Sequence, residues 1–143
     1  MKNSLSLKVT GAGGLLCLLC ALPATAQISN GVDFTTKFPF YAGNTKLPAG
    51  TYKIIPSGYN DTTLMIQDAS GKHSAFLEYN TNQSAAGHKT SEVTFKKYGD
   101  TDFLDMIWIP GQSSGVQIDP TKVEMKLAAS GQPQAHSVPG KPK

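Results

Sequence analysis

Apolar and polar residues alternate with a period of two over residues 32–118, and glycine and proline interrupt the alternation at short intervals. Such a pattern is typical of short antiparallel strands joined by tight turns. No window of this stretch keeps the period of about 3.6 residues that marks an amphipathic helix. The pattern therefore predicts an all-β fold, either an antiparallel sandwich or a small, partly closed barrel of about six to eight strands.

Turn residues mark several strand boundaries. Gly43 and Asn44 suit a turn that needs a positive φ angle, and residues 48–50 (Pro-Ala-Gly) suit a turn with proline second and glycine fourth. Residues 68–71 (Asp-Ala-Ser-Gly) fit a four-residue hairpin turn. Residues 81–91 are small and polar without any apolar period, which predicts a mobile surface loop of the kind that often carries function.

The clearest hairpin is predicted around residues 98–111, YGDTDFLDMIWIPG. With its turn centred on Asp100 and Thr101, the register pairs Val93 with Trp108, Phe95 with Met106, and Lys96 with Asp105. This register gathers the side chains of Phe95, Met106 and Trp108 on one apolar face, so that core packing is their expected role. Because residues 103–109 are apolar on both faces apart from Asp105, we expect this strand to be central and covered on its second face.

Three carboxylates in this hairpin raise the question of an active site. The register makes Asp105 the partner of Lys96, in an ion pair worth a few tenths to about 1 kcal/mol. Asp100 occupies a turn position where aspartate bonds to the following backbone. Only Asp102 is left without a structural role. A cation site at Asp100 and Asp102 is the alternative, but the spacing lacks the further acid and glycine of an EF-hand loop.

A short C-terminal helix is predicted after Asp119 and Pro120, an N-cap acid followed by proline at the first helical position. It covers residues 121–129, places Val123, Leu127 and Ala128 on a common face, and is the obvious cover for the strand at residues 103–109. Residues 130–143 have the proline, glycine and lysine content of a disordered tail. The predicted β domain with its helix therefore spans residues 27–129.

The first 26 residues have the three parts of an export signal. Lys2 and Lys8 form a positive region, residues 9–22 an apolar run, and residues 24–26 (Ala-Thr-Ala) a cleavage site. The run is shorter than the roughly 18 residues that a membrane-spanning helix needs. We therefore expect cleavage after Ala26 and a secreted or periplasmic protein that is not membrane-integral.

Composition narrows the function further. Both cysteines, Cys17 and Cys20, lie inside the signal, so neither disulfides nor thiolate zinc sites are expected in the mature chain. Removing Lys2 and Lys8 leaves eleven lysines and no arginine against ten acidic residues, a net charge of +1. A chain without arginine or a basic stripe is a poor nucleic-acid binder, so nucleic-acid partners are not expected.

Two segments, LPAGTYKI at residues 47–54 and FKKYGDTDFLDMIWIPG at residues 95–111, are followed by a short helix after DPTKVE. In these features residues 32–128 resemble a group of small exported proteins of unknown function that are common in Acidobacteria. The group has a similar LPAGTY hairpin, a Tyr-Gly-Asp turn, a Phe-Leu-x-x-x-Trp strand and a C-terminal helix. The resemblance implies an exported β-rich fold, and it implies no activity.

Catalytic and metal motifs give weak signals. Residues 111–115 match Gly-x-Ser-x-Gly, the spelling of a nucleophile elbow, but the residues that follow do not predict a helix, and His136 falls in the predicted tail. The three histidines lack metal-ligand spacing, so no metal or cofactor is expected. A pair of facing glycosidase carboxylates is not indicated either.

These observations favour an exported, non-catalytic binding or structural module of the periplasm or cell exterior, with an unknown envelope partner or small ligand. The candidate ligand surface comprises Asp100, Asp102, His88 and Trp108, since Trp108 can also serve as a sugar-stacking platform. One alternative is a carbohydrate-active or cation-dependent enzyme that uses Asp100 and Asp102. A second alternative is a small-ligand-carrying β-barrel with a cavity beside Trp108 and Met106.

Overall fold

The computed structural model of this 143-residue chain describes residues 28, 30–83, 88–112 and 114–143. The expected signal peptide therefore lies outside the described residues. The same holds for residues 84–87 of the predicted loop and for Ser113 of the Gly-x-Ser-x-Gly motif. The rest of that loop is shorter than predicted, because a strand continues as far as Gln83.

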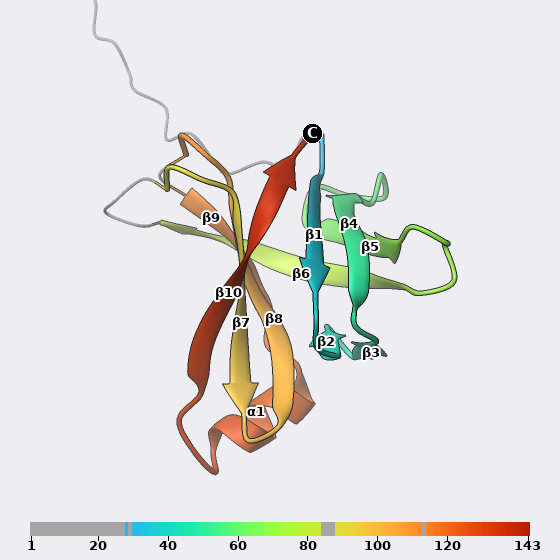
Figure 1. Cartoon of the computed structure of the whole chain (residues 1–143). Helices are drawn as coiled ribbons and strands as arrows, with labels where there is room; N and C mark the ends of the chain where they lie inside the picture. Colours follow the sequence, from blue (N-terminus) through green and yellow to red (C-terminus); the bar gives the residue numbers. More distant parts are fainter. Residues whose placement is uncertain (1–27, 29, 84–87, 113) are drawn as a thin grey trace, which may run out of the picture.

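The described residues form ten strands and one helix (Figure 1). In chain order they are β1 (Val32–Thr36), β2 (Phe40–Ala42), β3 (Thr45–Leu47), β4 (Gly50–Pro56), β5 (Thr63–Asp68), β6 (Ser74–Gln83), β7 (Glu92–Tyr98), β8 (Thr101–Trp108), β9 (Ser114–Ile118), α1 (Lys122–Ala128) and β10 (Gln134–Pro142).

Eight of these strands close into an antiparallel barrel in the order β8–β7–β10–β1–β4–β5–β6–β9, with β9 returning to β8. The β2–β3 hairpin is attached outside this ring, through a parallel bridge between Tyr41 of β2 and Phe103 of β8. Strand β8 has three neighbours because β9 pairs only with Met106 and Ile107, near its other end. The prediction of an all-β fold with one short helix is thus confirmed, and the closed barrel is the form it takes.

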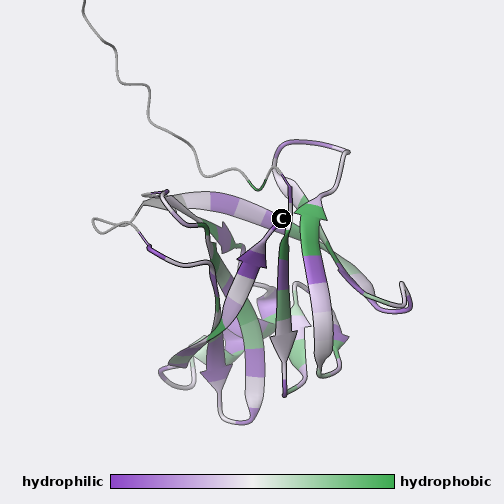
Figure 2. Cartoon of the chain, turned by 45° about the horizontal axis from the view of Figure 1, so that its top comes forward, coloured by the Kyte–Doolittle hydropathy of each residue, from purple (hydrophilic) through white to green (hydrophobic). Residues whose placement is uncertain are grey.

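The barrel interior is filled by side chains. Four buried aromatic residues, Phe34, Phe40, Tyr52 and Phe95, pack against one another, with ring centroids 5.3 Å apart for both Phe40–Tyr52 and Phe40–Phe95. The Tyr52 hydroxyl donates a hydrogen bond of 2.6 Å to the Pro48 carbonyl, so its polar atom is satisfied. Hydrophobic and hydrophilic residues alternate along the strands (Figure 2), as expected when one face of each strand lines a packed interior.

The β7–β8 hairpin forms as predicted but in a different register. Its turn is Gly99-Asp100, with Tyr98 opposite Thr101, and Gly99 has a φ of 60°, as the first central residue of a type II′ turn requires. A β-bulge follows on β8, because Thr94 pairs with Met106 while the next residue, Phe95, pairs with Leu104. The bulge inserts one residue and reverses the alternation beyond it.

The bulge decides which residues enter the core. Leu104 and Ile107 are both buried in the main core cluster, whereas Met106 and Trp108 remain partly exposed outside it. The prediction that Trp108 packs in the core was therefore wrong, since it assumed an unbroken alternation along β8. The predicted ion pair is confirmed on the outer face, with Lys96 Nζ 2.7 Å from Asp105 Oδ1.

The helix begins later than predicted and presents a different face. Thr121, not Asp119, is the N-cap: its hydroxyl accepts a 3.2 Å hydrogen bond from the Glu124 N–H. The Glu124 carboxylate accepts from the Thr121 backbone in return, which completes a capping box. Glu124 is buried and Val123 is half exposed, so the predicted apolar face was wrong. Electrostatic interactions of Glu124 with Lys96 and Asp105 place this side of α1 over the outer face of the β7–β8 hairpin.

The predicted disordered tail was also wrong, because residues 134–142 form β10 between β7 and β1. The strand pairs with β7 through Pro139 and with β1 from Gly140 onward, so Pro139 lies where the strand changes neighbours (Figure 1). Gly140 permits close packing there, since a Cβ atom would lie 2.7 Å from Ser91 Oγ and 3.0 Å from Val32 Cγ1. The composition of the β10 segment resembles that of a linker, but this strand is needed to close the barrel.

Candidate functional site

The four predicted site residues lie at opposite ends of the β7–β8 hairpin. Asp100 and Asp102 are at the turn, whereas Trp108 is at the far end of β8, stacked on His88. Six residues of strand separate Asp102 from Trp108, which corresponds to roughly 20 Å at about 3.3 Å per residue. The structure therefore does not bring these residues together into one surface.

Asp102 is buried and bonds to a histidine that the sequence had placed in the tail. Its Oδ1 lies 2.5 Å from Nε2 of His136, and the exposed fractions of the two side chains are 6% and 35%. The His136 ring also packs on Phe38 and Phe95, at centroid distances of 4.9 and 5.6 Å. The pair joins β8 to β10 across β7, so these contacts have a structural role.

The three hairpin acids do not converge. Asp102 and Asp100 border a small hollow beside β2, but Asp105 is on the outer face with Lys96. Asp100 is exposed in the turn. The enzyme alternative relies on Asp100 and Asp102, and the hollow that both border is only about 30 Å³, with Asp102 bonded to His136.

Trp108 and His88 form a second cluster. Their rings stack 3.8 Å apart at 15°, and His88 Nδ1 lies 3.7 Å from Glu92 Oε2. Trp108 also lies against Gly115, where a Cβ atom would come within 2.8 Å of the indole. This contact explains a glycine of the Gly-x-Ser-x-Gly motif by packing. It also occupies ring surface that a stacked sugar would need.

Two further hollows lie elsewhere, on the outer face of β10, β1, β4 and β5. One of about 430 Å³ borders β1, β4 and the β5–β6 turn, and another of about 350 Å³ borders β10, β1 and β4. They share Asp33 and Thr51, so we treat them as one outer groove. Most of the residues that line it are polar, namely Asp33, Thr35, Thr51, Lys53, Gln67, Asp68, Ser70, Lys141 and Lys143, and apolar atoms of Phe34, Tyr52 and Pro139 also border it.

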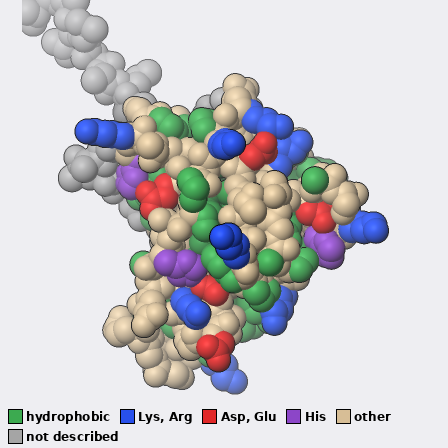
Figure 3. Space-filling model, in the orientation of Figure 1, with side chains coloured by type: hydrophobic (Ala, Val, Ile, Leu, Met, Phe, Trp, Pro, Cys, Tyr) green, Lys and Arg blue, Asp and Glu red, His purple; other side chains and the backbone are tan. Residues whose placement is uncertain are grey.

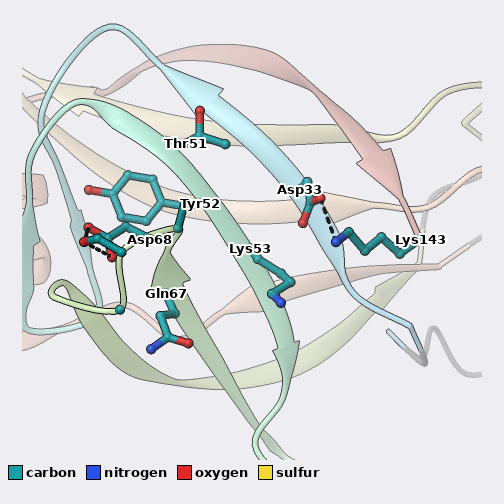
Figure 4. Close-up of a pocket in the computed structure, with 10 residues that line it drawn as sticks. Asp33, Thr51, Tyr52, Lys53, Gln67, Asp68 and Lys143 are labelled. Carbon is teal, nitrogen blue, oxygen red and sulfur yellow. Dashed lines mark hydrogen bonds and ion pairs between the residues drawn. The ribbon is translucent and has the colours of Figure 1, made fainter.

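Strand register explains why these residues meet. Asp33 lies opposite Lys141 on one side and Lys53 on the other, and Lys53 lies opposite Gln67. These four outward residues form a row across four neighbouring strands, which we call the charged row. Thr35 and Thr51 are paired one step along the strands, with their hydroxyls 2.9 Å apart. Figure 4 shows Asp33, Lys53 and Gln67 on the three adjacent strands that border the larger hollow.

The charges in the groove are only partly compensated. Lys143 Nζ lies 3.4 Å from Asp33 Oδ2, and the other carboxylate oxygen of Asp33 is buried without a hydrogen-bond partner among the described residues. Within the same described ranges, neither Lys53 nor Lys141 forms an ion pair. Figure 3 shows basic side chains gathered around an acidic one at the C-terminal end of β10. The groove therefore offers two uncommitted cations.

The β5–β6 turn forms the opposite rim. Asp68 Oδ2 lies 2.7 Å from His73 Nδ1, and the Ser70 hydroxyl donates to both carboxylate oxygens of Asp68 at 2.9 and 3.0 Å. The hydrogen bond from His73, helped by that from Ser70, lowers the pKa of Asp68 to about 2. The predicted turn is confirmed by the 3.1 Å bond from Gly71 N–H to the Asp68 carbonyl. The acid of this rim is therefore already paired.

Such a groove suits binding better than reaction. Threonine hydroxyls and the Gln67 amide can exchange hydrogen bonds with a polar ligand, and free lysines can pair with anionic groups. In the described part of the chain, no group of three or more His, Cys, Asp or Glu side chains could hold a metal ion. No helix there is long and apolar enough to cross a membrane.

Comparison of this chain with protein-family models, curated proteins and solved structures finds no match. The resemblance to exported Acidobacteria proteins therefore stays a prediction. The groove was not predicted from the sequence, although its residues Asp33, Thr35, Thr51 and Lys53 alternate outward along β1 and β4. Alternation tells which residues face outward, but the order of strands around the barrel is needed to see which of them meet.

Proposed function

We propose that this protein is an exported, non-catalytic binding module of the periplasm or cell exterior, and that its outer groove binds a polar, anionic ligand. The observation that supports this most directly is the charged row. Lys53 and Lys141 flank Asp33 on the barrel surface without an ion-pair partner among the described residues. The export signal predicted at residues 1–26 supports the location.

The filled interior favours a surface site over a carrier. Phe34, Phe40, Tyr52 and Phe95 occupy the space in which a carrier barrel would hold its ligand. Trp108 and Met106, beside which such a cavity was expected, are outside the core cluster. Since the groove is open to solvent, we expect modest affinity that falls as salt is added.

Binding is tested by titrating the purified, exported chain with sulfated dextran and with neutral dextran at low salt, by calorimetry and two-dimensional NMR. We expect binding of the sulfated polymer only, with the largest shifts in β1, β4 and β10. The double variant K53Q/K141Q should weaken binding about tenfold, at roughly 0.7 kcal/mol for each exposed charge contact.

The matched control removes the same charge from another surface. Lys122 and Lys126 are exposed on α1, so K122Q/K126Q lowers the net charge equally and leaves the groove intact. We expect this control to keep the wild-type affinity. Equal weakening in both double variants would mean nonspecific attraction, and the absence of any binding to sulfated dextran would also overturn the proposal.

Export has its own test. When the full chain is expressed in a bacterium with a periplasm, we expect the protein in the periplasmic or extracellular fraction with Gln27 at its N-terminus, because residues 24–26 form the predicted cleavage site. N-terminal sequencing checks this directly. An uncleaved chain in the cytoplasm would contradict the proposed location but not the proposed binding of a ligand by the outer groove.

A further inference from the structure

An apolar row runs beside the charged row of the outer groove. Ile55, Met65 and Phe76 lie opposite one another on β4, β5 and β6. Ile55 and Met65 are each two residues from a groove residue on the same strand, Lys53 and Gln67, and so face outward on the same side of the sheet. Two residues of strand correspond to about 7 Å, so the two rows are adjacent.

This row exposes more apolar surface than a soluble barrel needs. Phe76 is 58% exposed near the start of β6, and Tyr59, which is 81% exposed, meets its ring edge to face at a centroid distance of 5.8 Å. Scattered single apolar residues need no explanation, but neighbouring exposed rings in line with further apolar side chains mark a contact surface.

A glycine lies at the β1 end of the row. The chain there is Gly31, with a φ of 96°, and a Cβ atom would lie 2.9 Å from Cγ2 of Ile55. Ile55 therefore lies over the glycine backbone, and Gly31, which continues the apolar row on the β1 side, adds no side chain that would cover Ile55.

From this juxtaposition we infer that the ligand of the groove is an acidic polysaccharide. This inference rests on the proposed function and names its ligand class. A uronic acid ring carries a carboxylate, hydroxyls at its edge and an apolar face of C–H groups. Lys53 and Lys141 match the carboxylates, Gln67 matches the hydroxyls, and the apolar face packs on Phe76 and Tyr59, since aromatic side chains combine large contact area with little entropy cost.

An acidic peptide is the competing ligand, and the sheet disfavours it. One common way in which an extended peptide gains affinity is to add a strand to a free sheet edge through main-chain hydrogen bonds. Strands β1, β4 and β5 are each paired on both sides, so the groove offers no free edge. A peptide would be left with side-chain contacts alone, whereas a polysaccharide binds through such contacts.

Three probes distinguish the contribution of the ligand's carboxylate charge to binding from that of its sugar ring. Oligogalacturonate has both the acid and the sugar ring, its methyl ester keeps the ring without the charge, and poly-L-glutamate has the charge without the ring. By calorimetry and NMR we expect oligogalacturonate to bind at least tenfold more tightly than either of the others. The variant F76A should weaken oligogalacturonate binding about fivefold and leave poly-L-glutamate binding unchanged.

Controls distinguish this inference from the function on which it rests. Met125 is 52% exposed on α1, so M125A removes a comparable exposed side chain away from the groove and should have no effect. Equal affinity for oligogalacturonate and poly-L-glutamate, with F76A like wild type and K53Q/K141Q weakened, would overturn the polysaccharide inference and leave the anion-binding function standing. If none of the anionic probes binds, sulfated dextran included, both the polysaccharide inference and the anion-binding function are refuted.

Discussion

Replacing His136 with phenylalanine tests whether the Asp102–His136 pair holds the end of the barrel together. Phenylalanine keeps a ring in contact with Phe38 and Phe95, but it cannot bond to the carboxylate. Asp102 is then left buried, with only 6% of its side chain exposed. The change therefore isolates the polar interaction from the packing.

The expected loss follows from that burial. Removing the bonded partner of a buried charged group costs about 3–5 kcal/mol when neither water nor another group replaces it. The lower end applies here, since Asp102 borders a small hollow at the barrel end through which water can reach it. We expect H136F to lose about 3 kcal/mol of unfolding free energy, or roughly 10–15 °C in Tm for a domain of this size.

Replacing Asp102 instead of His136 is expected to lower the free energy of unfolding by less. In D102L the orphaned partner is His136, whose side chain is 35% exposed and can be hydrated, so about 1 kcal/mol is lost. The double variant H136F/D102L replaces the pair with apolar groups and should come within about 1 kcal/mol of wild type. Urea denaturation of the four proteins closes a double-mutant cycle with a coupling energy of about 3 kcal/mol.

A coupling energy near zero would refute this reasoning. It would mean that water or another group satisfies Asp102 and that the pair adds nothing to the fold. An unchanged Tm in H136F would lead to the same conclusion, and it would reopen Asp102 as a residue kept for chemistry.

Three further predictions concern stability. G115A should lose about 1 kcal/mol and shift the fluorescence of Trp108, the single tryptophan, because the new methyl group displaces its indole. E124Q should gain a few tenths of a kcal/mol at pH 7 in urea denaturation: burial raises the pKa of Glu124 above its ordinary value, so the stabilising effect of this buried carboxyl is complete at low pH and lost as pH rises, whereas glutamine stays neutral. The pKa of Asp68, lowered to about 2 by His73, predicts a contribution that is present above about pH 4 and lost as pH falls towards 2; D68N should flatten this part of a Tm-against-pH curve, and an unflattened curve would contradict it.

The sequence predicted local structure well where turn chemistry controls it. The Asp68–Gly71 turn, the positive φ of Gly43 and the Lys96–Asp105 ion pair are all present. Each of these depends on residues close in sequence or facing each other across one hairpin. The all-β class followed from the same short-range alternation.

The errors arose where a long-range partner overrides the local pattern. The bulge opposite Thr94 and Phe95 shifts Trp108 out of the core, and alternation alone does not reveal an inserted residue. The C-terminal segment has the composition of a disordered tail, yet Val138 and His136 pack against the barrel interior because β7 and β1 leave a gap that only this strand fills. Which strand fills it is a property of the whole topology.

The outer face of β4, β5 and β6 has apolar side chains that folding does not require. Tyr52, Ile54, Ile66 and Leu77 point inward and account for the stability of these strands. Their outward neighbours could all be polar, and a barrel with a polar surface would be at least as soluble. That an exposed Phe76 lies instead beside a charged row is not explained by stability, so we look for its explanation in what the surface contacts.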